Sequence, residues 1–287
     1  MYVYNYIHTV TIIVYMADHK EKIILASFDI GKKNFAQYVE ECDVKSLYSL
    51  RDRYQALPKT KQRRVKGKMN DDIAKILEEV CLKGKRIQAG VYDLRDDKES
   101  NELDMGTRKN IARHLEKYIP LWNRCEGFII EQQFFAKFNQ TGGRGAKTQA
   151  NIDAIKIAEG IIFWFLGTYP TKEVMYFSST FKTQMLGAPP LKERERKFWA
   201  IDKAKEIYTK RKDKDAVALY DLSTIVKGKR MNSEEKIQGY LDRFPGEGED
   251  IRETGEKVIR YKQKLCDISD AMLQLQAFKY RTFIGEF

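Results

Sequence analysis

Apolar runs of strand length recur along the chain and predict a five-stranded sheet. Residues 23–30 (IILASFDI) are apolar until a single acid, which is the pattern of a strand buried in the middle of a sheet. Residues 34–41 alternate in polarity, so we expect a second strand that pairs antiparallel with the first. Three further strands are expected at 86–94, 127–131 and 173–177.

Helical patterns fill the segments between these strands. Residues 43–84 predict two helices, and 104–125 are amphipathic, with apolar residues at helical spacing. An apolar helix is expected at about 149–166 and a last helix at about 265–283. Three meandering strands followed by alternating helices and strands predict an α/β fold with a mixed sheet flanked by helices.

The remaining segments are interpreted as additions to a single domain that spans residues 1–287. Residues 1–20 form an N-terminal extension that is apolar and aromatic but lacks the basic start of a secretion signal. We expect helical insertions at about 43–84 and 188–262. The insertions would make one elaborated domain rather than two separate ones.

Composition and charge narrow the function classes. The chain has 287 residues, 43% of them hydrophobic, which excludes a generally disordered protein. Lys and Arg number 52 against 41 Asp and Glu, and the net charge of +11 points to a polyanionic partner. Four scattered cysteines with no CxxC pair argue against a zinc site or a disulfide framework, so an intracellular, reduced protein is expected. No apolar run reaches bilayer length, and no membrane partner is expected.

Two basic segments are candidates for phosphate contacts. Residues 59–68 hold six basic residues and no acid, and include Arg63 and Arg64. Residues 192–214 hold ten basic residues against five acids. The second segment fits DNA binding and fits equally a solvated helix with ion pairs along its surface.

Four carboxylates are the candidate chemistry. Asp29 and Glu131 close buried strands, where each would either cap a turn or serve a site, because an unpartnered buried charge is costly. Asp267 and Asp270 lie three residues apart, on one face of the last helix. Four acids directed at one point require a cation, and oxygen ligands suit Mg²⁺ or Mn²⁺. Spacing alone leaves open whether the acids converge.

Four motifs resemble those of the Holliday junction resolvases of the RNase H-like superfamily. The segment IIEQQFFAKFN at 129–139 resembles the region of the second acid in bacterial RuvC. The segments SFDIGKKNFA at 27–36 and KQKLCDISDAMLQ at 262–274 resemble the first-strand and last-helix motifs of the poxvirus and mitochondrial resolvases. The segment SSTFKTQMLG at 178–187 is similar to the family's exit from the fifth strand. The chain is longer than typical members, which suits a large DNA virus or an organellar homologue.

The resemblance implies an RNase H-like fold of the RuvC type and a metal-dependent endonuclease that resolves Holliday junctions and other branched DNA. By position, Asp29, Glu131, Asp267 and Asp270 would hold two Mg²⁺ ions, with Mn²⁺ as a substitute, and Lys182 would contact the scissile phosphate. The family also implies a homodimer, because a four-way junction has near-twofold symmetry. The protein would act in a cytoplasmic viral factory, the nucleus or an organelle.

DNA contacts are expected mainly from the loop that follows the second acid. Phe134 aligns with a family aromatic that stacks on a base, although it also suits a core position. The DNA-binding candidates are Phe134, Lys137, Arg144, Lys147, Arg63 and Arg64.

Three alternatives share part of this pattern. A RuvC-like transposase or recombinase carries the same acids but usually a further C-terminal domain. An actin-like sugar kinase also opens with a strand and an Asp-Ile-Gly turn, but needs a second phosphate-binding glycine motif. A non-catalytic protein that binds branched DNA would have no need of the four acids.

Overall fold

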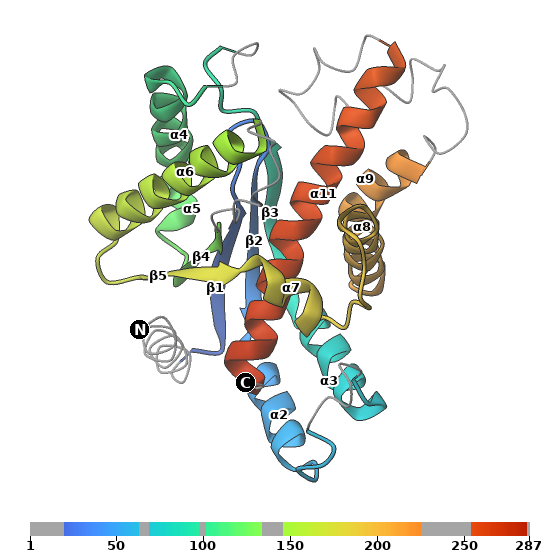
Figure 1. The fold of residues 1–287 in the computed structure, drawn as a ribbon. Coiled ribbons are helices and arrows are strands. Elements are labelled where there is room, and N and C mark those ends of the chain that lie inside the picture. Colours follow the sequence, from blue (N-terminus) through green and yellow to red (C-terminus); the bar gives the residue numbers. More distant parts are fainter. Residues whose placement is uncertain (1–19, 63–68, 98–101, 134–145, 225–253, 286–287) are drawn as a thin grey trace.

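The computed structural model describes residues 20–62, 69–97, 102–133, 146–224 and 254–285 (Figure 1). They form an α/β fold around a mixed five-stranded sheet with the order β3-β2-β1-β4-β5. β2 pairs antiparallel with β1 and with β3, whereas β1, β4 and β5 run parallel. The strands are β1 (Lys22–Asp29), β2 (Phe35–Asp43), β3 (Gly84–Tyr92), β4 (Gly127–Gln132) and β5 (Glu173–Ser178). The five predicted strands are confirmed, with ends shifted by up to two residues.

Helices cover both faces of the sheet (Figure 1). The helices are α2 (Val44–Gln55), α3 (Asp71–Leu82), α4 (Met105–Lys117), α5 (Ile119–Trp122), α6 (Ala146–Thr168), α7 (Ser179–Met185), α8 (Glu193–Lys210), α9 (Lys214–Thr224) and α11 (Thr254–Lys279), with a π-helical turn at Tyr280–Ile284. The described helices α4, α5 and α6 pack on one face, and α2, α3, α7, α8, α9 and α11 on the other. None of the described helices is both long and apolar enough to cross a membrane.

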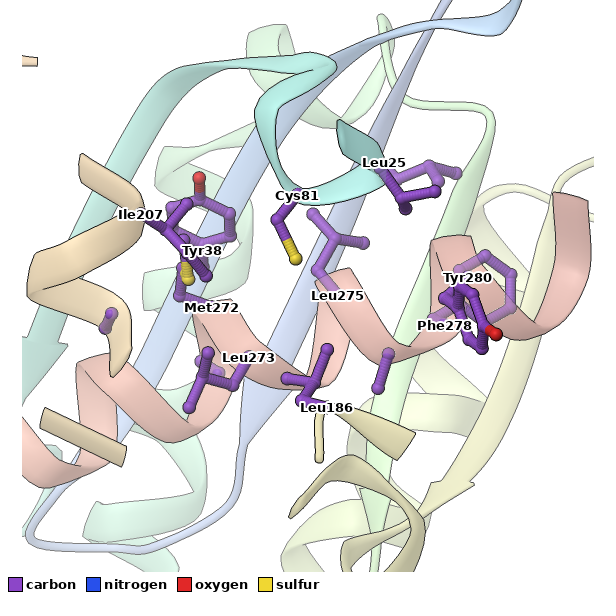
Figure 2. Packing of buried hydrophobic residues seen from close by; sticks show 14 of the residues in the cluster. Leu25, Tyr38, Cys81, Leu186, Ile207, Met272, Leu273, Leu275, Phe278 and Tyr280 are labelled. Atoms are coloured by element: carbon purple, nitrogen blue, oxygen red, sulfur yellow. The ribbon is translucent and has the colours of Figure 1, made fainter. Parts of the chain in front are cut away.

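The central strand β1 is covered on both faces of the sheet, which accounts for its apolar sequence. Leu25 packs in the cluster that includes α11, whereas Ala26 and Phe28 pack in the cluster that includes α6. Figure 2 shows the first cluster, in which Leu25 of β1 and Leu275 of α11 lie among side chains from several helices. A strand buried on both faces has no polar face to alternate with, so its sequence is a continuous apolar run.

Three helical segments differ from the sequence prediction. The expected helix at 104–125 is divided at Tyr118. The next helix, α5, begins at Ile119 with Pro120 in its first turn, because proline suits the start of a helix and not its interior. The last helix begins at Thr254, eleven residues earlier than expected, since 254–264 are mostly polar and carry no apolar periodicity. The short helix α7 was not expected and follows β5 directly.

A fully buried carboxylate ties the helices to β2. Glu40 accepts hydrogen bonds from Arg211 Nη1 at 2.7 Å, Lys279 Nζ at 2.6 Å and Tyr38 Oη at 2.6 Å. Arg211 also donates to the carbonyl oxygen of Cys81 in α3. Burial alone would raise the pKa of Glu40, but the charges of Arg211 and Lys279 lower it to about 2. The cluster therefore joins β2, α3, α11 and the end of α8 through one buried carboxylate that pairs with two cations.

The lowered pKa of Glu40 predicts that the fold loses stability in acid. Because its pKa is lower in the folded chain than in the unfolded chain, its stabilisation is complete above about pH 4.5 and is lost as the pH falls toward 2. We expect a loss of roughly 3 kcal/mol in the free energy of unfolding over that range. Urea denaturation measured at intervals between about pH 5 and pH 2 tests this.

The Glu40→Gln variant should be less stable by roughly 3–5 kcal/mol at neutral pH, since Arg211 and Lys279 would lose their buried anion. It should also lose most of this acid dependence. Glu41→Gln is the matched control, because Glu41 pairs with the exposed Lys22 and should change stability by less than about 1 kcal/mol. A Glu40→Gln variant as stable as the control would contradict the prediction.

Candidate active site

Asp29 and Glu131 are brought together by the parallel pairing of β1 and β4. Phe28 pairs with Ile130, so the next residue of each strand lies at the same edge of the sheet. The chain between them is long, but the carboxyl ends of neighbouring parallel strands meet in space. Electrostatic coupling and a hydrogen bond between the two carboxyl groups follow from this placement.

Helix α11 adds Asp267 and Asp270 and is fixed in position by Gln274. The Gln274 amide donates to Ser27 Oγ at 3.0 Å, to the Phe28 carbonyl at 3.2 Å and to the Ile129 carbonyl at 3.3 Å. Gln274 therefore contacts both strands that carry the first two acids. Asp270 lies one helical turn before Gln274 on the same face, so the same contacts set the position of Asp270 over the sheet edge.

Lys182 enters the same cluster from α7, one turn after β5 ends. Its side chain is 7% exposed, and its ammonium lies 3.0 Å from Glu131 Oε1 and 3.2 Å from Asp270 Oδ1. The second oxygen of Glu131 accepts a hydrogen bond from Gln133 Nε2 at 2.7 Å. Lys182 thus joins a strand-end acid to a helix acid.

The charges of this cluster perturb one another strongly. Burial, and then the charge of Glu131, raise the pKa of Asp29 well above its usual range. Although burial opposes it, Lys182 lowers the pKa of Glu131. Burial and Asp270 raise the pKa of Asp267 to about 8. The negative charge of the four acids is therefore incompletely balanced by one ammonium.

The donor set suits a hard divalent cation. Four carboxylates supply the oxygen ligands that Mg²⁺ and Mn²⁺ prefer. Asp267 Oδ2 is buried and has no hydrogen-bond partner among the described residues, so it is available as a ligand. As they stand, no three acidic, histidine or cysteine side chains in the described part of the chain form a ready-made metal cage. The chemistry of the donors fits, and the ammonium of Lys182 occupies part of the space between them.

Two proteins of invertebrate iridescent viruses are similar to this chain. Uncharacterized protein 170L of Invertebrate iridescent virus 6 is 28% identical over 275 residues, which cover 91% of this chain and 90% of that protein. Uncharacterized protein 97L of Invertebrate iridescent virus 3 is 25% identical over 202 residues, covering 66% of this chain and 87% of that protein. No protein-family model matches the chain, and no solved structure matches it. These comparisons indicate no activity for the chain.

The structure brings all five predicted catalytic residues into one cluster. Asp29, Glu131, Asp267 and Asp270 interact with Lys182 or with one another. The predicted contact between Lys182 and a phosphate stays a prediction, and its observed partners are two of the acids. Gln133 and Gln274 were missed. The spacing of Gln274, four residues after Asp270 in a predicted helix, was the signal that could have identified it.

The DNA-binding candidates stay predictions. Lys147 lies in the first turn of α6, and its side chain is not among those described. The other candidates lie outside the described residues: Phe134, Lys137, Arg144, Arg63 and Arg64.

The basic segment at 192–214 contains several ion pairs. Lys210 contacts Glu206 at 2.6 Å and Glu78 at 2.7 Å, Lys203 contacts Glu206 at 3.0 Å, and Arg211 belongs to the Glu40 cluster. For residues 203–211, these contacts favour a solvated helix with ion pairs along its surface over a DNA-binding segment. Lys197 is exposed and close enough to Asp267 for its charge to lower the pKa of that acid, so it lies near the site.

Replacing Gln274 tests how α11 is held over the strands. Gln274→Met keeps the side-chain length but removes the donors to both strands, so we expect the free energy of unfolding to fall by roughly 1–3 kcal/mol. Urea denaturation measures this, with Gln55→Met on the exposed surface of α2 as the matched control. Equal stability of the two variants would show that these hydrogen bonds do not hold α11 in place.

Proposed function

We propose that this chain is a divalent-metal-dependent endonuclease that cuts Holliday junctions and other branched DNA. One observation carries the proposal. Carboxylates from β1, β4 and α11, which the sequence predicts as catalytic, meet at one edge of the sheet together with Lys182. Structural acids have no reason to accumulate at one point, because their mutual repulsion costs stability.

The topology supports an RNase H-like assignment. The strand order β3-β2-β1-β4-β5, with β2 antiparallel to its neighbours, is the arrangement that the family resemblance implies. In that fold the acids of the first and fourth strands are neighbours and the last helix crosses their ends. The placement of β1, β4 and α11 agrees with this expectation.

The acids and the lysine have distinct tasks in this proposal. Asp29, Glu131, Asp267 and Asp270 would hold the divalent metal and orient the phosphodiester beside it. Bound Mg²⁺, or Mn²⁺ in its place, supplies an activated water and offsets the charge that develops on the phosphate oxygens. The buried ammonium of Lys182 adds fixed positive charge next to the acids, where it has few waters to reorganise. Gln274 acts as a positioning residue, because it touches the strands that carry two of the acids and not the reacting atoms.

Branched DNA is the substrate class that suits the rest of the chain. The net charge of +11 favours a polyanion, and contacts to phosphates would make binding steeply dependent on salt. A homodimer would present two acid clusters to the two symmetric strands of a four-way junction. The names of the two similar viral proteins state no activity.

Cleavage of a labelled four-way junction tests the proposal. With Mg²⁺ we expect paired cuts in the junction and none in a linear duplex of matched sequence, and no cuts with EDTA. Asp29→Asn and Asp267→Asn should each lower the cleavage rate by roughly 10²-fold or more while junction binding is retained. Asp52→Asn is the matched control, because Asp52 is exposed on α2, which begins at the opposite end of the sheet from Asp29.

Several outcomes would contradict the proposal or redirect it. Equal cutting of linear duplex would remove the junction specificity, and full activity of Asp267→Asn would remove that acid from the site. Junction binding without cutting under any divalent ion would favour a non-catalytic branched-DNA-binding protein. Products in which DNA strands are joined would favour the transposase alternative.

A further inference from the structure

The ammonium of Lys182 lies between two of the proposed metal ligands. It bridges Glu131 Oε1 at 3.0 Å and Asp270 Oδ1 at 3.2 Å, and these acids come from different elements, β4 and α11. In a site built for two divalent ions, a cation that joins acids from opposite sides is one of the metals. Here a residue of the chain already makes that link.

Both carboxylate oxygens of Glu131 already accept hydrogen bonds from the chain. One of its oxygens accepts from Lys182, and the other accepts from Gln133 Nε2 at 2.7 Å. Both oxygens are therefore engaged by donors from the chain. By contrast, Asp267 Oδ2 is buried and has no partner among the described residues. The oxygen without a partner therefore belongs to a different acid from the two that Lys182 contacts.

The position of Lys182 is set by packing as well as by charge. It lies in α7, which follows β5 directly and packs against α11. Leu186, immediately after α7, is buried in the core cluster that contains Phe177 of β5 and Phe278 of α11. Because Lys182 is buried and its helix packs against α11, the ammonium has the acids as its partners in place of bulk water.

We propose that Lys182 permanently occupies one of the two cation positions, so that each chain binds a single divalent ion on the Asp267 side of the cluster. This inference rests on the proposed function, because it concerns the metal of the same site. It changes the expectation of two ions per site, which came from the family resemblance. The reaction would then use one metal ion and one ammonium.

Counting bound Mn²⁺ tests the inference without any measurement of cleavage. The full-length chain is titrated with Mn²⁺ and followed by electron paramagnetic resonance and calorimetry. We expect one ion per chain in the unmodified protein. Lys182→Met removes the charge with little change of length, so this variant should bind two ions with the spectrum of a coupled pair. Its first ion should bind roughly tenfold more tightly or better, because a nearby positive charge is gone.

Two further variants serve as controls for loss of folding and for the removal of a positive charge elsewhere on the chain. Lys182→Arg keeps the positive charge and should still bind one ion. Lys45→Met removes an exposed lysine from α2 and should also bind one ion with unchanged affinity. If Lys182→Met fails to fold, two ions in the unmodified chain would still overturn the inference.

The outcomes separate this inference from the proposed function. Two ions in the unmodified chain, or one ion in both the unmodified chain and Lys182→Met, would overturn the inference and leave a metal-dependent nuclease intact. No bound ion, together with cleavage that is absent or insensitive to EDTA, would overturn the proposed function as well.

Discussion

Buried carboxylates must be balanced by buried cations, and this requirement organises the face of the sheet that α11 covers. At the site, Glu131 and Asp270 are held against the ammonium of Lys182. Deeper in the fold, Glu40 is held between Arg211 and Lys279, both nearly or fully buried. Removing one partner of either group would leave an uncompensated charge in a medium that solvates it poorly. Each cluster therefore fixes the relative positions of the elements that supply its charges.

Helix α11 connects the two clusters. Asp267 and Asp270 belong to the site, Gln274 contacts β1 and β4, and Lys279 reaches Glu40. From Asp267 to Lys279 the helix advances about 18 Å. Because a helix of this kind is stiff, the ion cluster around Glu40 and the Gln274 hydrogen bonds together determine where the two aspartates lie. The geometry of the proposed metal site thus depends on contacts well away from it.

The charges of the four acids and of Lys182 also affect how many metal ions the proposed site can hold, which is where it differs from the family expectation. The four acids of the cluster accumulate more negative charge than one lysine offsets, which favours a divalent ion. Lys182 nevertheless engages the acids from two elements, so the space for metal is smaller than four carboxylates alone would suggest. The similarity to two proteins of iridescent viruses covers 66% of the chain in one case and 91% in the other.

The local pattern of the sequence determined the strands, most of the helices and the identity of the four acids. Continuous apolar runs predict strands covered on both faces, and Asp29 and Glu131 could be recognised because an acid at the end of such a run is unusual. The spacing of Asp267 and Asp270 placed them on one helical face. The start of α11 was missed, because its first eleven residues are mostly polar, and α7 was missed because it is only seven residues long.

Only the tertiary structure decided which groups balance these charges. Lys182 pairs with an acid 51 residues away, and Gln274 contacts a serine 247 residues away. Glu40 was not recognised as buried, since an acid in a strand is ordinarily solvent-facing and its cations come from 171 and 239 residues along the chain. Local periodicity reports which face of an element is buried, but not which side chain lies opposite it. That depends on how the elements pack, and packing determined that a lysine lies among the acids of the proposed metal site.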